Sequence, residues 1–120
     1  MPGDPRAFLW DVRKAADHIA AFIRDKTVEE FARDELLHSA VERQLEIIGE
    51  ALNQIAKVAP DMAGRITNLR QIVGLRNILI HGYAVVNHAL IWRAIHEDLP
   101  QLRATVDGLL EGGPGAPLPS

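Results

Sequence analysis

The sequence predicts an all-α fold, a bundle of four or five helices in an up-and-down arrangement. Apolar residues recur at spacings of three and four along most of the chain, which is the period of an amphipathic helix. Residues that favour helix starts precede these segments. No segment shows the period of two expected of a half-buried strand, and no Asn-Gly dipeptide that would turn a hairpin occurs.

The first predicted helix begins at Asp4-Pro5, a capping carboxylate followed by proline at the first helical position. Its apolar residues continue at helical spacing to about Ile23. Trp10 lies off the centre of this stripe, so we expect it to pack at the rim or at a contact between subunits.

Two further helices are predicted before residue 60. Thr27 and Glu30 form a capping-box pattern that would open a short helix ending near Ala32. Asp34 would then cap a long helix ending near Val58, whose seam has apolar spacings of 4, 4, 3, 4 and 3: Leu37, Val41, Leu45, Ile48, Leu52 and Ile55. Gly49, inside this helix, is expected to mark a close crossing with the first helix or with a dimer partner.

A connecting loop is predicted up to about Thr67, with Thr67 or Asn68 capping the next helix. Gly82 suits the end of that helix, because glycine accepts the left-handed conformation found there. Asn87 is expected to cap a further helix. Pro100 should break or kink it, leaving a final amphipathic stretch with Leu102, Val106 and Leu109.

The 120 residues are expected to form a single helical domain at 1–111, followed by a disordered Gly- and Pro-rich tail at 112–120. The absence of cysteine excludes disulfides, thiolate nucleophiles and zinc held by cysteine. No apolar run is long enough for a membrane span and the start has no apolar signal core, so no membrane contact is expected, and the lack of cysteine permits a reducing compartment. The net charge of −3 argues against a general nucleic-acid coat.

The stretch from Leu69 to Tyr83 holds the one anomaly in the pattern. On a helical wheel, Arg76 falls near the middle of an apolar stripe formed by Leu69, Ile72, Val73, Leu79 and Ile80. A buried guanidinium costs several kcal/mol unless it is paired or lines a wet cleft. A helix with such a residue therefore points to a functional site or to a specific interface.

The charge along the chain is uneven around this stretch. Residues 62–96 contain four of the 13 basic residues and none of the 16 acidic ones. This gap is either a chance feature of a buried helix pair or a local positive field suited to a phosphate-bearing ligand. His38 is expected to be a surface imidazole, and Glu42 to lie on a solvated face. His88 and His96 have no convincing ligand spacing, so no metal site is predicted.

Arg76 and His81 form a minimal set for cleaving RNA. Arginine binds phosphate oxygens, histidine moves protons near neutral pH, and RNA supplies its own nucleophile, the 2′-hydroxyl. Positions five apart on one helix lie about 140° apart. The pair could therefore meet only if the helix loosens before Gly82, or if two copies of the chain meet across a two-fold axis.

Purely structural interpretations of the same residues remain open. His81 could cap the helix end, where an imidazolium is favoured, and Tyr83 could be an ordinary packing residue. Arg76 could pair with a glutamate of the long helix, such as Glu46 or Glu50.

The pattern Arg76-Asn77-x-x-x-His81-x-Tyr83 resembles the signature of the HEPN superfamily of all-helical ribonucleases, in its HepT-like toxin branch. The resemblance extends to the first helix, to EIIGEALNQI in the long helix and to the closing IWRAIHEDLPQL, and covers most of residues 6–103. Many members of the family have a Trp-type residue shortly before the motif helix, where this chain reads Ile66-Thr67-Asn68.

The resemblance implies a cytoplasmic toxin of a type VII-like toxin–antitoxin pair that cleaves RNA without a metal or cofactor. Arg76 and His81 would be catalytic, and Asn77 would orient them. The family forms homodimers in which two copies of the motif line one cleft. A cognate MntA-like nucleotidyltransferase antitoxin would neutralise the toxin by transferring AMP to Tyr83. The alternative is a catalytically silent helical dimeric module that only binds such a nucleotidyltransferase.

Overall fold

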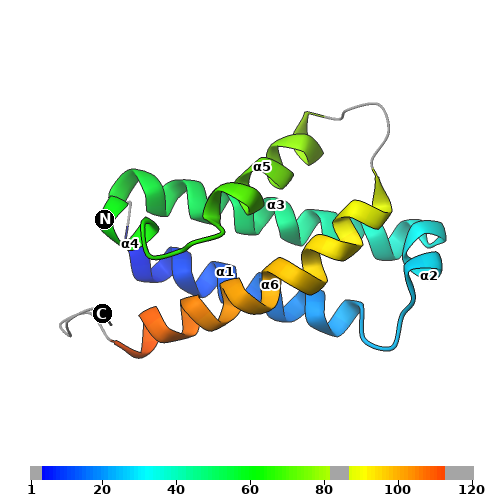
Figure 1. Cartoon of the computed structure of the whole chain (residues 1–120), viewed down its shortest axis with the longest axis horizontal. Helices are drawn as coiled ribbons and strands as arrows, with labels where there is room; N and C mark the ends of the chain where they lie inside the picture. Colours follow the sequence, from blue (N-terminus) through cyan, green and yellow to red (C-terminus); the bar gives the residue numbers. More distant parts are fainter. Residues whose placement is uncertain (1–3, 82–86, 113–120) are drawn as a thin grey trace.

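The computed structural model describes residues 4–81 and 87–112. Within these ranges the chain is entirely helical, with four long helices, two short ones and no strand, which confirms the predicted all-α class (Figure 1). The helices are α1 Pro5–Phe22, α2 Val28–Arg33, α3 Glu35–Val58, α4 Pro60–Ala63, α5 Leu69–Ile80 and α6 His88–Glu111. The predicted tail lies outside the described residues except for Gly112, the C-cap of α6.

The four long helices alternate in direction, as an up-and-down bundle requires (Figure 1). α3 packs against α1 on one side and α5 on the other, and α1 also packs against α6. The short α2 contacts both α3 and α6. α5 crosses α3 obliquely and has few contacts with α6, so its last turn projects from the bundle (Figure 1). This arrangement presents the C-terminal end of α5 at the surface.

Four predicted helix starts are confirmed by side-chain hydrogen bonds. Asp4 accepts from the Arg6 amide and Asp34 from the Leu37 amide, each at 3.0 Å. Thr27 and Glu30 form the complete capping box, and Asn87 accepts from the Leu90 amide at 3.0 Å. Each cap satisfies amide groups that have no partner inside the helix.

The predicted cap of α5 is wrong. Asn68 occupies the N-cap position but makes no capping hydrogen bond. Its buried amide instead donates to the backbone carbonyl of Asp98 in α6 at 2.9 Å. Thr67 accepts from Gln101 in the same helix at 2.9 Å. Both polar side chains therefore join the start of α5 to α6.

Two expectations about chain breaks also change. The predicted loop before Thr67 contains the one-turn helix α4, which begins at Pro60, where the fixed φ of proline favours a helix start. The expected break at Pro100 is absent, because α6 continues through this residue as a single helix. Proline lacks the amide that a helix interior needs, so packing must maintain the helix there, with Leu99 and Leu102 buried on either side.

The core is formed by side chains of α1, α2, α3, α5 and α6, and its largest fully buried side chains are aliphatic apart from one phenylalanine. They are Phe31, Leu9, Ile19, Leu45, Ile48, Leu52, Ile55, Ile72, Ile91, Leu102, Val12 and Val41. None of the described helices is both long enough and apolar enough to cross a bilayer. Trp10 is half exposed and lies beneath the guanidinium of Arg13, 5.1 Å from the ring centre.

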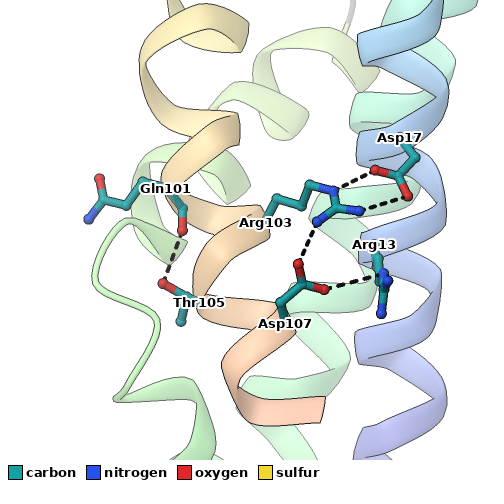
Figure 2. A network of polar contacts seen from close by, with 6 residues as sticks. All are labelled: Arg13, Asp17, Gln101, Arg103, Thr105 and Asp107. Atoms are coloured by element: carbon teal, nitrogen blue, oxygen red, sulfur yellow. Dashed lines mark hydrogen bonds and ion pairs between the residues drawn. The ribbon is translucent and has the colours of Figure 1, made fainter. Parts of the chain in front are cut away.

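A charged network ties α1 to α6 at the rim of this core (Figure 2). Arg103 of α6 donates to both carboxylate oxygens of Asp17 in α1 and also pairs with Asp107. Asp107 in turn lies 3.3 Å from Nε of Arg13. The hydrogen bond from Arg103 lowers the pKa of Asp17, and the same bond raises the pKa of Arg103.

Candidate functional site

The candidate site lies at the C-terminal half of α5, where Arg76 and His81 share one helix. The helix is regular through Ile80, and the amide of His81 donates to the carbonyl of Asn77 at 3.1 Å. His81 is the C-cap and keeps right-handed helical dihedrals, φ −83° and ψ −4°. The helix therefore does not loosen before residue 82.

This regularity bears on the first of the two predicted ways of bringing the pair together, a loosening of the helix before Gly82. On a continuous helix, residues 76 and 81 lie about 140° apart around the axis and about 7.5 Å apart along it. Their backbone positions consequently point the two side chains to different sides of α5. A composite site built from both residues is geometrically simpler between two copies of the chain than within one.

Arg76 leaves α5 directly over Gly49 of α3. A Cβ atom added at Gly49 would collide with Cβ and Cγ of Arg76. Gly49 therefore does mark a close helix crossing, as predicted, but its partner is α5 and not α1. Only glycine leaves room for the arginine stem at this crossing.

Among the described residues, the guanidinium of Arg76 has two hydrogen-bond partners. Its Nη2 donates to Oε2 of Glu50 at 2.6 Å, and its Nη1 donates to Oδ1 of Asn77 at 3.1 Å. The ion pair with Glu50 is one of the two that the sequence suggested, whereas Glu46 lies near Arg43 at 3.9 Å. Nε of Arg76 is buried and has no hydrogen-bond partner within the part of the chain that the structure describes.

The ion pair is not sealed from solvent. The side chain of Arg76 is 19% exposed and that of Glu50 is 50% exposed. An ion pair with this exposure is weak, because solvent screens the attraction between the charges. A phosphate could therefore compete with the Glu50 carboxylate for the guanidinium, since both are bidentate acceptors for arginine.

An open groove of about 340 Å³ lies between α1, α3 and α5 beside this pair. Its lining residues are Phe8, Asp11, Arg43, Glu46, Ile47, Glu50, Ala51, Gln54, Arg76 and Ile80. The lining includes three carboxylates and two guanidiniums. The lining of this groove is therefore not predominantly positive, because α1 and α3 supply carboxylates beside Arg76.

The apolar stripe predicted around Arg76 also needs correction. The buried residues of α5 are Ile72 and Leu75, and Leu75 was absent from the predicted stripe. Ile80, which was assigned to it, is 43% exposed, and Ile78 is 40% exposed. Two large aliphatic side chains thus face solvent beside His81, which is itself exposed.

The remaining predicted site residues fall into two groups. Asn77 is exposed and in direct contact with Arg76, a geometry compatible with an orienting role. Tyr83 and Gly82 lie outside the described residues.

The sequence matches a known protein family along most of its length. The model of the family described as "Ribonuclease HepT-like" matches residues 12–109. "Putative RNase MJ1380" of Methanocaldococcus jannaschii is 37% identical over 106 residues, which cover 87% of this chain and 94% of that protein. "Probable ribonuclease HepT" of Thermococcus cleftensis is 32% identical over 113 residues, which cover 91% of this chain and 98% of that protein. No solved structure gives a significant match.

Proposed function

The chain belongs to the family of HepT-like ribonucleases, and we propose that it is a metal-independent endoribonuclease that acts as the toxin of a toxin–antitoxin pair. The position of Arg76 is the main observation that supports this proposal. A guanidinium is held at the edge of a groove by a partly exposed ion pair, five residues before an exposed histidine at the end of the same helix. Both residues fall inside the segment that matches the family.

The proposed reaction is a transesterification within the RNA chain. The 2′-hydroxyl attacks the adjacent phosphorus, the bond to the 5′-oxygen breaks, and the products are a 2′,3′-cyclic phosphate and a free 5′-hydroxyl. His81 is proposed to transfer the proton, and Arg76 to stabilise the charge on the phosphoryl oxygens in the transition state. Asn77, which accepts a hydrogen bond from Arg76, would keep the guanidinium oriented after Glu50 is displaced.

The active form is proposed to be a homodimer, because Arg76 and His81 lie on different sides of α5. A two-fold axis near the end of α5 would bring Arg76 of one protomer towards His81 of its partner. The exposed Ile78 and Ile80 beside the motif offer apolar surface for such a contact. The projection of α5 from the bundle leaves this end accessible (Figure 1).

Purified protein incubated with total RNA in EDTA tests the reaction. Wild-type protein should cleave RNA and leave 2′,3′-cyclic phosphate ends, whereas Arg76→Ala and His81→Ala should lose at least about a hundredfold in rate. Arg70→Ala and His18→Ala, which remove exposed residues of the same types, should retain the wild-type rate. Equal RNA loss with all these proteins would reject the nuclease.

Mixing the two inactive variants tests the composite site. After subunit exchange, a mixed dimer of Arg76→Ala and His81→Ala chains keeps one intact Arg76–His81 pair only if the pair forms across the interface. Random exchange should then restore roughly a quarter of the wild-type rate. A site contained within one protomer would remain inactive in every combination.

Neutralisation is proposed to occur by AMP transfer to Tyr83. A cognate MntA-like nucleotidyltransferase would attach the α-phosphoryl group of ATP to the phenol oxygen, with release of pyrophosphate. Tyr83 is the single tyrosine in the sequence, so co-expression should add adenylyl mass to the wild-type chain and none to Tyr83→Phe. Adenylyl mass that persists on the Tyr83→Phe chain would exclude this modification site.

The alternative function is a silent dimeric module that binds a nucleotidyltransferase. The close pairing of Arg76 with Glu50 favours it, because a guanidinium that keeps its own carboxylate would not bind phosphate. The cleavage assay separates the two functions, because the module should bind the nucleotidyltransferase while leaving RNA intact.

A further inference from the structure

A second cluster of chemically active side chains lies away from Arg76, where α2, α3 and the start of α6 meet. We propose that His38, Glu42 and His88 form a binding site for a first-row transition-metal dication such as Zn²⁺. One potential ligand atom from each of these residues lies within 4.8 Å of the other two. This site is independent of the proposed nuclease and adds a property that the nuclease does not require.

The two imidazoles converge on the same carboxylate oxygen. Nδ1 of His38 lies 3.2 Å from Oε2 of Glu42, and Nε2 of His88 lies 3.8 Å from that oxygen. Neighbouring ligands around tetrahedral zinc are separated by about 3.3 Å, given bonds of about 2.0–2.1 Å to nitrogen and oxygen. The two separations from Oε2 of Glu42 therefore lie within about 0.5 Å of this value.

The helices place these ligands without strain. His38 and Glu42 are four residues apart on α3, so they project from the same face one turn apart. His88 is the first residue of α6, whose start is fixed by the Asn87 cap. All three side chains are partly buried, which limits the competition from water.

The ring of Phe31 packs against both imidazoles and restricts their orientation. The buried ring of Phe31 lies edge-on to His38 and His88, with centroids 6.2 and 5.9 Å away. The two imidazole rings lie against each other at 4.2 Å. Because these contacts already restrict both imidazoles, the rings would lose little rotational freedom on binding an ion.

The ligand types select the metal class. Two imidazole nitrogens and one carboxylate oxygen suit Zn²⁺ and its neighbours, whereas Mg²⁺ and Ca²⁺ prefer sites made only of oxygen. Three protein ligands leave a fourth position for water. Because the ligands come from two helices, a bound ion would fasten the start of α6 to α3.

Zinc titration of protein that carries no histidine tag and has been freed of metal with EDTA tests the site. Calorimetry should show one Zn²⁺ per chain, and Zn²⁺ should raise the unfolding temperature where Mg²⁺ does not. Co²⁺ should give the visible absorption of a low-coordinate nitrogen and oxygen site. His38→Ala, His88→Ala and Glu42→Gln should each weaken Zn²⁺ binding by more than about tenfold.

His18→Ala removes an exposed histidine of α1 and should leave Zn²⁺ affinity unchanged. Glu42→Gln keeps the side-chain shape, so it remains a test of the metal site if a histidine variant loses its helical circular dichroism signal. The proposal is overturned if wild type binds Zn²⁺ no more tightly than the His38→Ala/His88→Ala double variant, or if Glu42→Gln binds as wild type does. RNA cleavage in EDTA is measured separately, so either proposal can fail alone.

Discussion

The stem of Arg76 lies directly on the backbone of Gly49. The crossing of α5 over α3 and the position of the guanidinium therefore both depend on glycine having no side chain there. The stem buries its methylene groups at this crossing and its charged end reaches Glu50. A glycine inside a helix ordinarily lowers stability, and here that loss permits the close approach of α5. The candidate site is therefore coupled to helix packing.

Replacing Gly49 by alanine should disturb both stability and activity. The new Cβ would overlap Cβ and Cγ of Arg76, which are the least mobile part of that side chain. We expect a loss of about 1–3 kcal/mol in the free energy of unfolding, measured in urea, and a loss of RNA cleavage because the guanidinium is displaced.

Gly74→Ala is the matched control, since Gly74 is a helical glycine of α5 where an added Cβ would have no atom of residues 4–81 or 87–112 within 4 Å. It should gain about 0.5–1 kcal/mol from better helix propensity and keep wild-type cleavage. A Gly49→Ala protein as stable as Gly74→Ala would show that α5 and α3 are not packed as closely as described.

Glu50→Gln should strengthen RNA binding. The carboxylate of Glu50 occupies the guanidinium of Arg76 and would repel a phosphate that approaches the same groove. Glutamine keeps an oxygen acceptor but removes the negative charge, so we expect the apparent RNA dissociation constant to fall severalfold at low salt. Fluorescence anisotropy measures this constant. Both proteins also carry His81→Ala, which prevents cleavage of the RNA. Glu97→Gln, at an exposed position of α6, controls for the overall change in charge. Weaker RNA binding by Glu50→Gln would instead identify Glu50 as a residue that positions Arg76.

Ile78→Glu should dissociate the proposed dimer. Ile78 is a large apolar side chain, 40% exposed, on the turn of α5 that precedes His81, and a charge buried at an interface is costly. Sedimentation should show the variant as a monomer with cleavage reduced at least about tenfold. Leu36→Glu, which alters the 83% exposed residue near the start of α3, should remain dimeric and active. Loss of the dimer in both variants, or in neither, would show that the dimer interface is not formed by this turn of α5.

The parts of the fold that follow from short stretches of sequence were predicted well. Asp4, Thr27, Asp34 and Asn87 cap helices as expected because each satisfies amides within three residues of itself. Asn68 has the same chemistry, but its amide is taken by a carbonyl thirty residues away in α6. Tertiary packing determines whether such a side chain caps its own helix or bonds to a distant acceptor. The sequence of one segment does not reveal that packing.

For the candidate site, too, local sequence features were predicted and contacts between helices were not. Arg76 was identified because a charge interrupts an apolar pattern, and Glu50 was one of two glutamates suggested as its partner. The choice between them depends on where α5 crosses α3, which Gly49 sets. The grouping of His38 with His88 was missed altogether. The local spacing of His38 and Glu42 was visible in the sequence, but the third ligand, His88, comes close to them only in the folded structure, where α2 packs against both α3 and α6.

The network that joins α1 to α6 predicts a dependence of stability on acid. Arg103 holds the pKa of Asp17 below its ordinary value of about 3.9, so the folded state favours the ionised carboxyl. The stabilisation is therefore complete above that ordinary value and is lost as the pH falls through the lower folded pKa. Asp17 is about half exposed, which limits the contribution to about 0.5–1 kcal/mol. As the pH falls from about 6 towards 2, wild type should progressively lose up to that much more stability in urea than Asp17→Asn, whereas Asp25→Asn, in the turn after α1, should follow wild type. Parallel pH profiles for wild type and Asp17→Asn would mean that the pair with Arg103 does not persist in solution.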